Sequence, residues 1–257
     1  MTAISDMIGG FPAQRLFGYP ARTSPRFSPD GKRLAFLAPE GGAPNIFVGD
    51  ADGKNARPVT RAGGHGVNRF LWALDGKHLL YFQDSDGDEN FRLFSVHAET
   101  GRTVELTPFG RVNVNIVGLS GAYPEELLIA MNLEDPRAYD VYRVNITDGK
   151  MRKVHQGDRT VTQWFADQQF RIRAAAAFRK DGSLEIRYRN DESEPWRTAY
   201  VWDPDAVAVS RPLSGLVKDQ PVMYAVDANR SPVGRLGKIR LDTGEFEEVF
   251  GDPENDQ

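Results

Sequence analysis

The sequence predicts an all-β protein built from repeated four-stranded sheets, and three observations lead to this prediction. Glycine turns recur at a nearly constant interval, short β-rich segments fill the intervals, and hardly any stretch has a helical period. The chain has 257 residues, of which 40% are hydrophobic and 26% are charged. Such a chain is an ordinary globular protein that is long enough to bury a core.

The repeat is marked by four turn segments, DADGK (50–54), AETGR (98–102), TDGK (147–150) and LDTGE (241–245). Their glycines, Gly53, Gly101, Gly149 and Gly244, are separated by 48, 48 and 95 residues. The last separation is close to twice the others, so one period lacks its marker and the array continues through it. A second series places Asp-Gly just before an apolar strand, in SPDGKRLAF (28–36), ALDGKHLLY (73–81) and RKDGSLEIRY (179–188). Asp-Gly favours a hairpin turn because Gly accepts positive φ and Asp tolerates it.

The segments between the turns have the composition of strands. They are rich in β-branched and aromatic residues and are bounded by Gly, Pro, Asn or Asp, as in KRLAFLAP, KHLLYFQD, DVYRVNIT and TAYVWD. The strongest helix candidate is 161–178, which contains an alanine run. We nevertheless expect a half-buried strand there, because Phe170, Ile172 and Ala174 alternate with Arg171 and Arg173. The basic residues of this region, Arg171, Arg173, Arg179 and Lys180, are expected to form one solvated strand edge.

A period of about 40 to 50 residues with four short strands is typical of a β-propeller blade. We expect one propeller domain over 1–257, with about five blades at 24–62, 66–109, 112–157, 160–205 and 214–251. The blades are expected to form part of a seven- or eight-bladed ring. One four-stranded sheet cannot cover both of its apolar faces, so neighbouring blades bury each other. A β-sandwich or a stack of hairpins is the alternative fold.

Charge and composition argue against several classes of partner. A net charge of −4 and a pI near 5.7 disfavour nucleic acid, whose phosphates demand clustered Lys and Arg. The absence of cysteine excludes disulfides and thiolate chemistry. We also expect no membrane span, because no apolar run approaches about 20 residues, and no secretory leader, because the first 20 residues lack an apolar core. A cytoplasmic protein is the resulting prediction.

An acidic loop stands out in YFQDSDGDENFRLFSVHAETG (81–101), where Asp84, Asp86, Asp88 and Glu89 fall between two strand segments. A calcium loop of the EF-hand type needs Gly at position 6 and Glu at position 12. Counting from Asp84 gives Glu89 and Ser95 at these positions. A pair of glycosidase carboxylates needs a separation that one tight loop does not guarantee. We therefore expect no metal or cofactor here, and a solvated hairpin tip is the simplest interpretation.

No catalytic residue is predicted. The nearest match to a G-x-S-x-G nucleophile elbow is GLSGA (118–122), in which Ala122 replaces the second glycine and a strand follows in place of a helix. Ser120 is therefore expected to be a loop residue. The four histidines, His65, His78, His97 and His155, lack the spacing of a metal site.

Several strings resemble the N-terminal propeller of the prolyl oligopeptidase family of serine peptidases, in its acylaminoacyl-peptidase and dipeptidyl-aminopeptidase branch. They are FSPDGKRLAFLAP, LLYFQDSDGDENFRLFSVHAETG, LTPF, MNLEDPRAYDVYRVNITDGK, SEPWR and VFGDPEND. The resemblance extends over nearly the whole chain. The SPDG string alone occurs in many propellers, whereas the combination of the acidic-loop string with NLEDPRAYDVYRV is much more specific.

This resemblance implies a propeller that filters short peptides by size for an α/β-hydrolase domain with Ser, Asp and His, a domain that the 257 residues do not contain. The chain itself is then non-catalytic. In the family one propeller face meets the hydrolase domain and the substrate chamber. Asp86, Asp88, Glu89 and Asn90 are accordingly candidate contacts for that domain or for a charged peptide terminus, with Arg92 pairing to an acid. The alternative is a free-standing five-bladed propeller that acts as a protein-interaction scaffold, as Tol-type propellers do. A fragment would instead self-associate through open blade edges.

Overall fold

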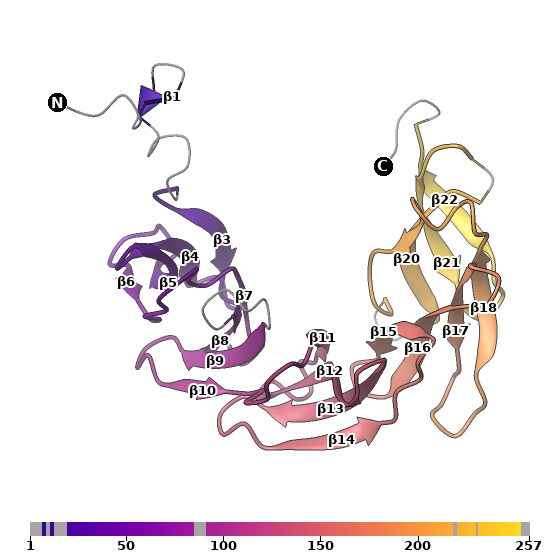
Figure 1. Cartoon of the computed structure of the whole chain (residues 1–257), viewed down its shortest axis with the longest axis horizontal. Coiled ribbons are helices and arrows are strands. Elements are labelled where there is room, and N and C mark those ends of the chain that lie inside the picture. The colour runs from indigo at the N-terminus through magenta and orange to yellow at the C-terminus, as the bar shows by residue number, and fades with distance from the viewer. Residues whose placement is uncertain are drawn as a thin grey trace. The chain divides into compact units, whose positions relative to one another are not determined.

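The computed structural model describes residues 20–84, 91–217, 220–229 and 231–252, together with the backbone of two short paired strands, β1 (Met7–Ile8) and β2 (Phe11–Pro12). This described part contains five antiparallel sheets of four strands each and no helix. Figure 1 shows that each sheet is made by four consecutive strands. The predicted all-β fold class is confirmed. Within the same residues, no helix of the length and apolarity needed to span a membrane is found.

We call the sheets blades one to five in chain order. Blade one contains β3 (Thr23–Phe27), β4 (Arg33–Glu40), β5 (Ala43–Asp50) and β6 (Arg57–Pro58). Blade two contains β7 (Arg69–Trp72), β8 (His78–Gln83), β9 (Arg92–His97) and β10 (Thr103–Glu105). Blade three contains β11 (Val114–Leu119), β12 (Glu126–Asp135), β13 (Ala138–Asn145) and β14 (Met151–His155). Blade four contains β15 (Val161–Ala166), β16 (Ile172–Phe178), β17 (Leu184–Tyr188) and β18 (Arg197–Trp202). Blade five contains β19 (Arg211–Pro212), β20 (Val222–Asp227), β21 (Arg235–Arg240) and β22 (Phe246–Phe250), and so begins before the expected residue 214.

The glycine markers close the turn between the third and fourth strands of blades one, two, three and five. The φ angles of Gly53, Gly101, Gly149 and Gly244 are 78°, 70°, 74° and 79°. Each glycine N–H donates a hydrogen bond to the main-chain carbonyl three or four residues earlier. Only glycine adopts this left-handed conformation at little cost, which explains the repeat in the sequence. Blade four joins β17 to β18 through a longer loop, residues 189–196, which explains why this period of the sequence lacks a glycine marker.

The chain divides into two compact units, Met1–Arg111 and Val112–Gln257, which we describe separately. The first unit holds blades one and two. Its core combines side chains of both blades, including Leu37 and Ile46 of blade one with Leu79 and Tyr81 of blade two. The indole Nε1 of Trp72 on β7 also donates a hydrogen bond to the Arg26 carbonyl on β3, over 3.0 Å. The two blades therefore bury each other's faces, as the repeat predicts.

The second unit repeats this arrangement twice. One core cluster joins blade three to blade four, with Leu128 and Val141 against Trp164 and Ile172. The Trp164 indole donates a hydrogen bond to the Tyr139 carbonyl of blade three, over 2.8 Å. A second cluster joins blades four and five through Ile186, Tyr188 and Trp202 on one side and Met223, Ala225 and Ile239 on the other. Blade four is thus covered on both faces.

The segment 161–178 corrects one sequence-based prediction. It forms two strands, β15 and β16, as expected of strand residues, but β16 lies second in its sheet and not at an edge. Ala174 and Ala176 pack toward blade five, while Ala175 and Ala177 pack toward blade three. Because neighbouring blades bury both faces of β16, the alternation of arginine with apolar residues does not produce a solvated face, and Arg173 is only 8% exposed. The prediction of a solvated edge is therefore wrong for Arg173, whereas Arg171 is partly exposed and Arg179 and Lys180 are exposed as expected.

Candidate functional site

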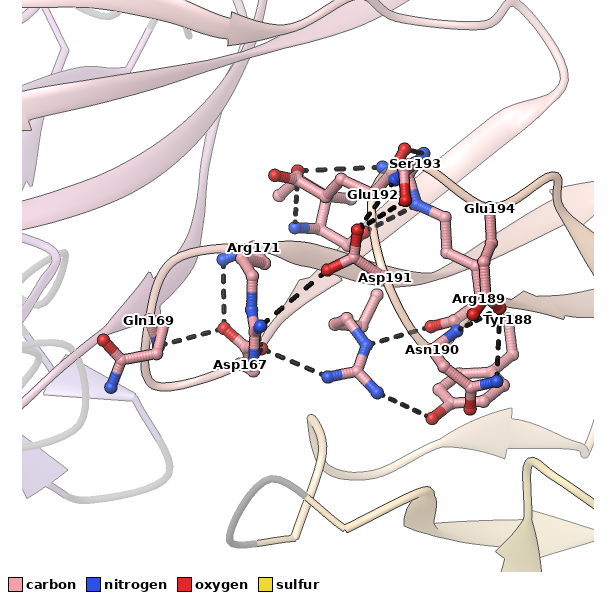
Figure 2. Close-up of polar contacts among 12 residues, drawn as sticks. Asp167, Gln169, Arg171, Tyr188, Arg189, Asn190, Asp191, Glu192, Ser193 and Glu194 are labelled. Carbon is pink, nitrogen blue, oxygen red and sulfur yellow. Dashed lines mark hydrogen bonds and ion pairs between the residues drawn. The ribbon is translucent and has the colours of Figure 1, made fainter.

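A cluster of charged side chains occupies one end of blade four (Figure 2). It forms where the turn between β15 and β16, residues 167–171, meets the loop 189–196 between β17 and β18. The first-to-second and third-to-fourth connections of an antiparallel sheet lie at the same end, which brings these segments together. Figure 2 shows Asp167 and Arg171 on the turn facing Asp191 on the loop. We call these residues, with Arg173, Tyr188, Arg189 and Glu192, the blade-four cluster.

Asp167 is the centre of the cluster, and its side chain is completely buried. Its carboxylate accepts hydrogen bonds from the main-chain N–H groups of Gln169 (2.9 Å) and Arg171 (3.0 Å). It also pairs with the guanidinium groups of Arg171 (2.7 Å) and Arg173 (3.3 Å). The turn that these bonds close places Phe170 at a φ of 61°, an unusual conformation for a residue with a side chain. Asp167 therefore both neutralises two cations and fixes a strained turn.

Arg173 and Arg189 extend the cluster across the sheet. Arg173 donates a hydrogen bond to the hydroxyl of Tyr188 (2.8 Å), and Arg189 donates one to the Glu192 carbonyl (2.9 Å). Burial lowers the pKa of the Arg189 guanidinium, an effect that Glu192 and Asp191 oppose and that nearby Arg173 reinforces. The group remains charged because arginine keeps its proton in proteins.

The charges of the cluster balance. Three arginines, Arg171, Arg173 and Arg189, face three carboxylates, those of Asp167, Asp191 and Glu192. The two buried guanidinium groups direct hydrogen bonds at protein acceptors. This arrangement holds two loops in place and offers no evident nucleophile or general base.

One end of blade three packs against the turn formed by residues 167–171. The ring of Tyr123 stacks on Phe170, with centroids 5.3 Å apart, and the Arg143 guanidinium lies 4.1 Å from the Tyr123 centroid. The hydroxyl of Ser120 donates a hydrogen bond to the Gln168 carbonyl and accepts one from the Ala122 N–H. Ser120 is completely buried in the turn that follows β11. The prediction that Ser120 is a structural loop residue is confirmed.

The acidic loop gives a partial outcome. Asp86, Asp88, Glu89 and Asn90 lie outside the described residues. Their flanking strands β8 and β9 pair as predicted, with Gln83 opposite Arg92. The Arg92 guanidinium forms an ion pair of 2.9 Å with Glu105 on the neighbouring strand β10.

The two described ends of the acidic loop, Asp84 and Phe91, line a cavity of about 590 Å³ in the first unit. His65 lines the same cavity, and its Nδ1 lies 3.4 Å from the Asp84 carboxylate. His65 of the glycine-rich link between blades one and two thus lies close to Asp84 at the end of β8. Asp84 is nearly buried, whereas His65 is largely exposed.

The other histidines have local partners. His78 Nδ1 lies 2.6 Å from the Asp75 carboxylate, and the His78 and His97 rings meet edge to face. His155 packs edge to face against Trp164, with centroids 4.7 Å apart. Across the residues that the structure describes, no three His, Asp or Glu side chains converge as a metal site would require.

Sequence reasoning missed the blade-four cluster because it treated the arginines of 171–180 as solvated. One signal was available. The only period without a glycine marker is the one whose third-to-fourth connection carries Asp191, Glu192 and Glu194. When a third-to-fourth connection lacks the turn glycine and carries several acids, a longer loop with a different role is expected in place of the tight turn.

Curated relatives match the chain over nearly its whole length. No family model matches the chain. Over 242 residues the chain is 30% identical to dipeptidyl aminopeptidase BIII of Pseudoxanthomonas mexicana, and over 263 residues it is 27% identical to dipeptidyl peptidase family member 6 of Caenorhabditis elegans. These alignments cover 94% and 96% of this chain but 35% of each relative. The chain therefore spans about a third of the length of these curated relatives.

Solved structures show the fold. A prolyl endopeptidase superposes with a TM-score of 0.64 at 16% identity, covering 91% of this chain and 36% of the endopeptidase. The β-propeller domain of the Trilobed protease from Pyrococcus furiosus gives a TM-score of 0.60 at 15% identity, covering 90% of this chain and 70% of that domain. The acylaminoacyl peptidase of Pyrococcus horikoshii gives 0.57 at 16% identity, covering 91% and 39%.

The five blades and these neighbours show that the chain has a β-propeller fold. Its sequence relatives are a dipeptidyl aminopeptidase and a dipeptidyl peptidase family member. The resemblance to the propeller of the prolyl oligopeptidase family, in its acylaminoacyl-peptidase and dipeptidyl-aminopeptidase branch, is confirmed.

Proposed function

We propose that this chain is the non-catalytic propeller portion of an acylaminoacyl-peptidase-like serine peptidase and controls the access of short peptides to an α/β-hydrolase domain. The observation that carries the proposal is the 30% identity to dipeptidyl aminopeptidase BIII over 94% of the chain. The burial of Ser120 supports a non-catalytic role, because a nucleophilic serine has to reach its substrate.

The proposal separates binding and filtering from chemistry. The chain supplies folded blades and loop clusters, and the hydrolase domain supplies the nucleophile, the base and the oxyanion hole. A fold by itself does not specify an activity, so the filtering role has to be tested directly.

The first test treats the purified chain with a fluorophosphonate probe and with a fluorogenic dipeptidyl substrate. We expect neither covalent labelling nor hydrolysis. Labelling at any serine would contradict the non-catalytic assignment.

The second test supplies the chain in trans to a separately produced α/β-hydrolase domain of this family. Cleavage of a dipeptidyl substrate is compared with cleavage of a quenched peptide of about thirty residues. We expect the chain to lower cleavage of the long peptide relative to the short one. An unchanged ratio, with binding of the two polypeptides shown by size-exclusion chromatography, would contradict filtering.

A further inference from the structure

A polar groove of about 550 Å³ lies in the first unit, between the outer edge of blade one and the turn that joins β9 to β10 in blade two. Residues 57–63 of blade one form one wall, and Thr100 and Thr103 stand on the other. Tyr81 and Gln83 also line it. We call this the outer groove. It lies apart from the blade-four cluster, which belongs to the second unit.

The outer groove is positively charged. Arg57 and Arg61 line it and are both exposed, whereas no Asp or Glu is among the described residues of its lining. This is unusual in a chain with 36 acidic and 32 basic residues. Arg57 donates a hydrogen bond to the main-chain carbonyl of Glu99, which fixes its position and leaves its charge without a carboxylate partner there.

Two acids close in sequence to the blade-two wall are engaged with other arginines. The Glu99 carboxylate lies 3.4 Å from Arg33, and the Glu105 carboxylate lies 2.9 Å from Arg92. Neither carboxylate lines the groove. Among the residues that the structure describes, no carboxylate pairs with Arg57 or Arg61, so both charges can bind an anionic ligand.

The wall formed by residues 57–63 is also an open sheet edge. β6 is the outermost strand of its sheet, and the chain beyond it continues alongside β5. The Val59 N–H donates a hydrogen bond to the Ile46 carbonyl (2.8 Å), and the Ala62 N–H donates one to the side chain of Asn45 (2.7 Å). Groups that face inward are thus satisfied, and the opposite edge of the segment carries no strand of this sheet. Pro58 has no N–H, so this edge can offer an added strand mainly carbonyl acceptors, which would pair with main-chain N–H donors of the ligand.

The edge is rigid before any ligand binds. Asn45 is almost completely buried, and its side-chain oxygen accepts a hydrogen bond from the Thr60 hydroxyl (2.8 Å). The Asn45 amide donates further hydrogen bonds to the Glu40, Ala43 and Ala62 carbonyls. A preformed edge lowers the ordering cost of binding.

We propose that the outer groove binds an extended acidic peptide segment, which adds as a strand along residues 57–63 and places its carboxylates on Arg57 and Arg61. Main-chain hydrogen bonds provide affinity in this mode of recognition, and side-chain contacts provide specificity. The inference does not depend on the peptidase role, because the segment is a bound partner and not a substrate.

The test measures the fluorescence anisotropy of fluorescein-labelled hexaglutamate with the full chain at low salt. We expect saturable binding that weakens as salt is added. The double variant Arg57→Gln/Arg61→Gln should bind at least about tenfold more weakly, since it loses two charge-assisted contacts. The matched control is Arg152→Gln/Arg211→Gln, which removes two exposed arginines of the second unit and should bind like the natural chain. Equal losses in both double variants, or no binding to the natural chain, would overturn the proposal.

A second peptide tests strand addition. Hexaglutamate with N-methylated peptide bonds keeps the number and spacing of the charges and removes the main-chain donors. We expect it to bind several-fold more weakly than hexaglutamate. Equal affinity of the two peptides would overturn strand addition, and circular dichroism of each variant establishes that the blades remain folded.

Discussion

Arg173 on β16 and Arg189, the first residue after β17, lie side by side, and each side chain binds the main chain of the other's segment. The Arg173 Nε donates a hydrogen bond to the Arg189 carbonyl (2.9 Å), and the Arg189 Nε donates one to the Ile172 carbonyl (3.0 Å). The Arg189 N–H also donates to the Arg173 carbonyl (3.0 Å). Two like charges are thus held together in a buried place, and this is stable only because Asp167 and Glu192 stand beside them.

The first prediction concerns the buried acid of this cluster. Asp167→Asn should destabilise the second unit by about 3 kcal/mol, because it leaves the buried Arg173 guanidinium without its counter-charge. The measurement is urea unfolding followed by tryptophan fluorescence. Asp191→Asn is the control and should change the midpoint little, since its carboxylate is half exposed. Similar midpoints for the two variants would contradict the assigned role of Asp167.

The second prediction concerns the indole hydrogen bonds between blades. Trp164→Phe removes the donor that pairs with the Tyr139 carbonyl, and Trp72→Phe removes the donor that pairs with the Arg26 carbonyl. Each change should cost about 1–3 kcal/mol, because a partly buried carbonyl loses its partner and the smaller ring packs less fully. Thermal unfolding of both variants provides the measurement. Trp196→Phe is the comparison, since Trp196 is a packing residue for which no blade-to-blade hydrogen bond is described, and its effect should be smaller.

The third prediction concerns pH. Burial lowers the pKa of His155 below the usual histidine value of about 6.5, and the nearby Arg189 charge lowers it further. The unfolded chain therefore binds a proton that the folded chain resists, so the contribution of His155 to stability is complete above about pH 6.5 and declines as the pH falls toward the lowered value. His155→Phe should flatten the dependence of melting temperature on pH in this window.

The fourth prediction concerns a close approach of two backbones. A Cβ atom on Gly157 would lie 2.7 Å from the Tyr139 carbonyl carbon, whereas a Cβ atom on Gly121 would meet nothing within 4 Å. Gly157→Ala should therefore destabilise the second unit by about 1–3 kcal/mol through a forced backbone shift. Gly121→Ala should be nearly neutral. A melting temperature for Gly157→Ala equal to that of Gly121→Ala would show that the backbone between blades three and four can shift without a loss of stability.

Local features account for what the sequence could predict. Gly53, Gly101, Gly149 and Gly244 adopt positive φ in turns that depend only on their immediate neighbours, so the repeat and the strands could be placed from the letters alone. The aromatic residues of blade two follow the same logic. Phe70, Trp72 and Tyr81 alternate along strands and enter the core between blades one and two.

The blade-four cluster could not be predicted in this way, because it depends on contacts between blades. Arg173 is buried only because blades three and five cover both faces of β16. A single strand pattern carries no information about a neighbour about fifty residues away. The outer groove was missed for a related reason, since Arg57 and Arg61 become a charged wall only when blade two is placed against blade one.

The longer third-to-fourth connection of blade four has a consequence for protein engineering. In blades one, two, three and five the third-to-fourth connection has five or six residues and contains one glycine of positive φ, whereas in blade four it has eight residues, 189–196, which are anchored by hydrogen bonds of Arg173 and Arg189. An insertion of foreign sequence directly after Ser193 would extend the exposed rim of this loop and leave Glu192 and the buried arginines in place. This connection is therefore a suitable insertion site for a designed recognition loop.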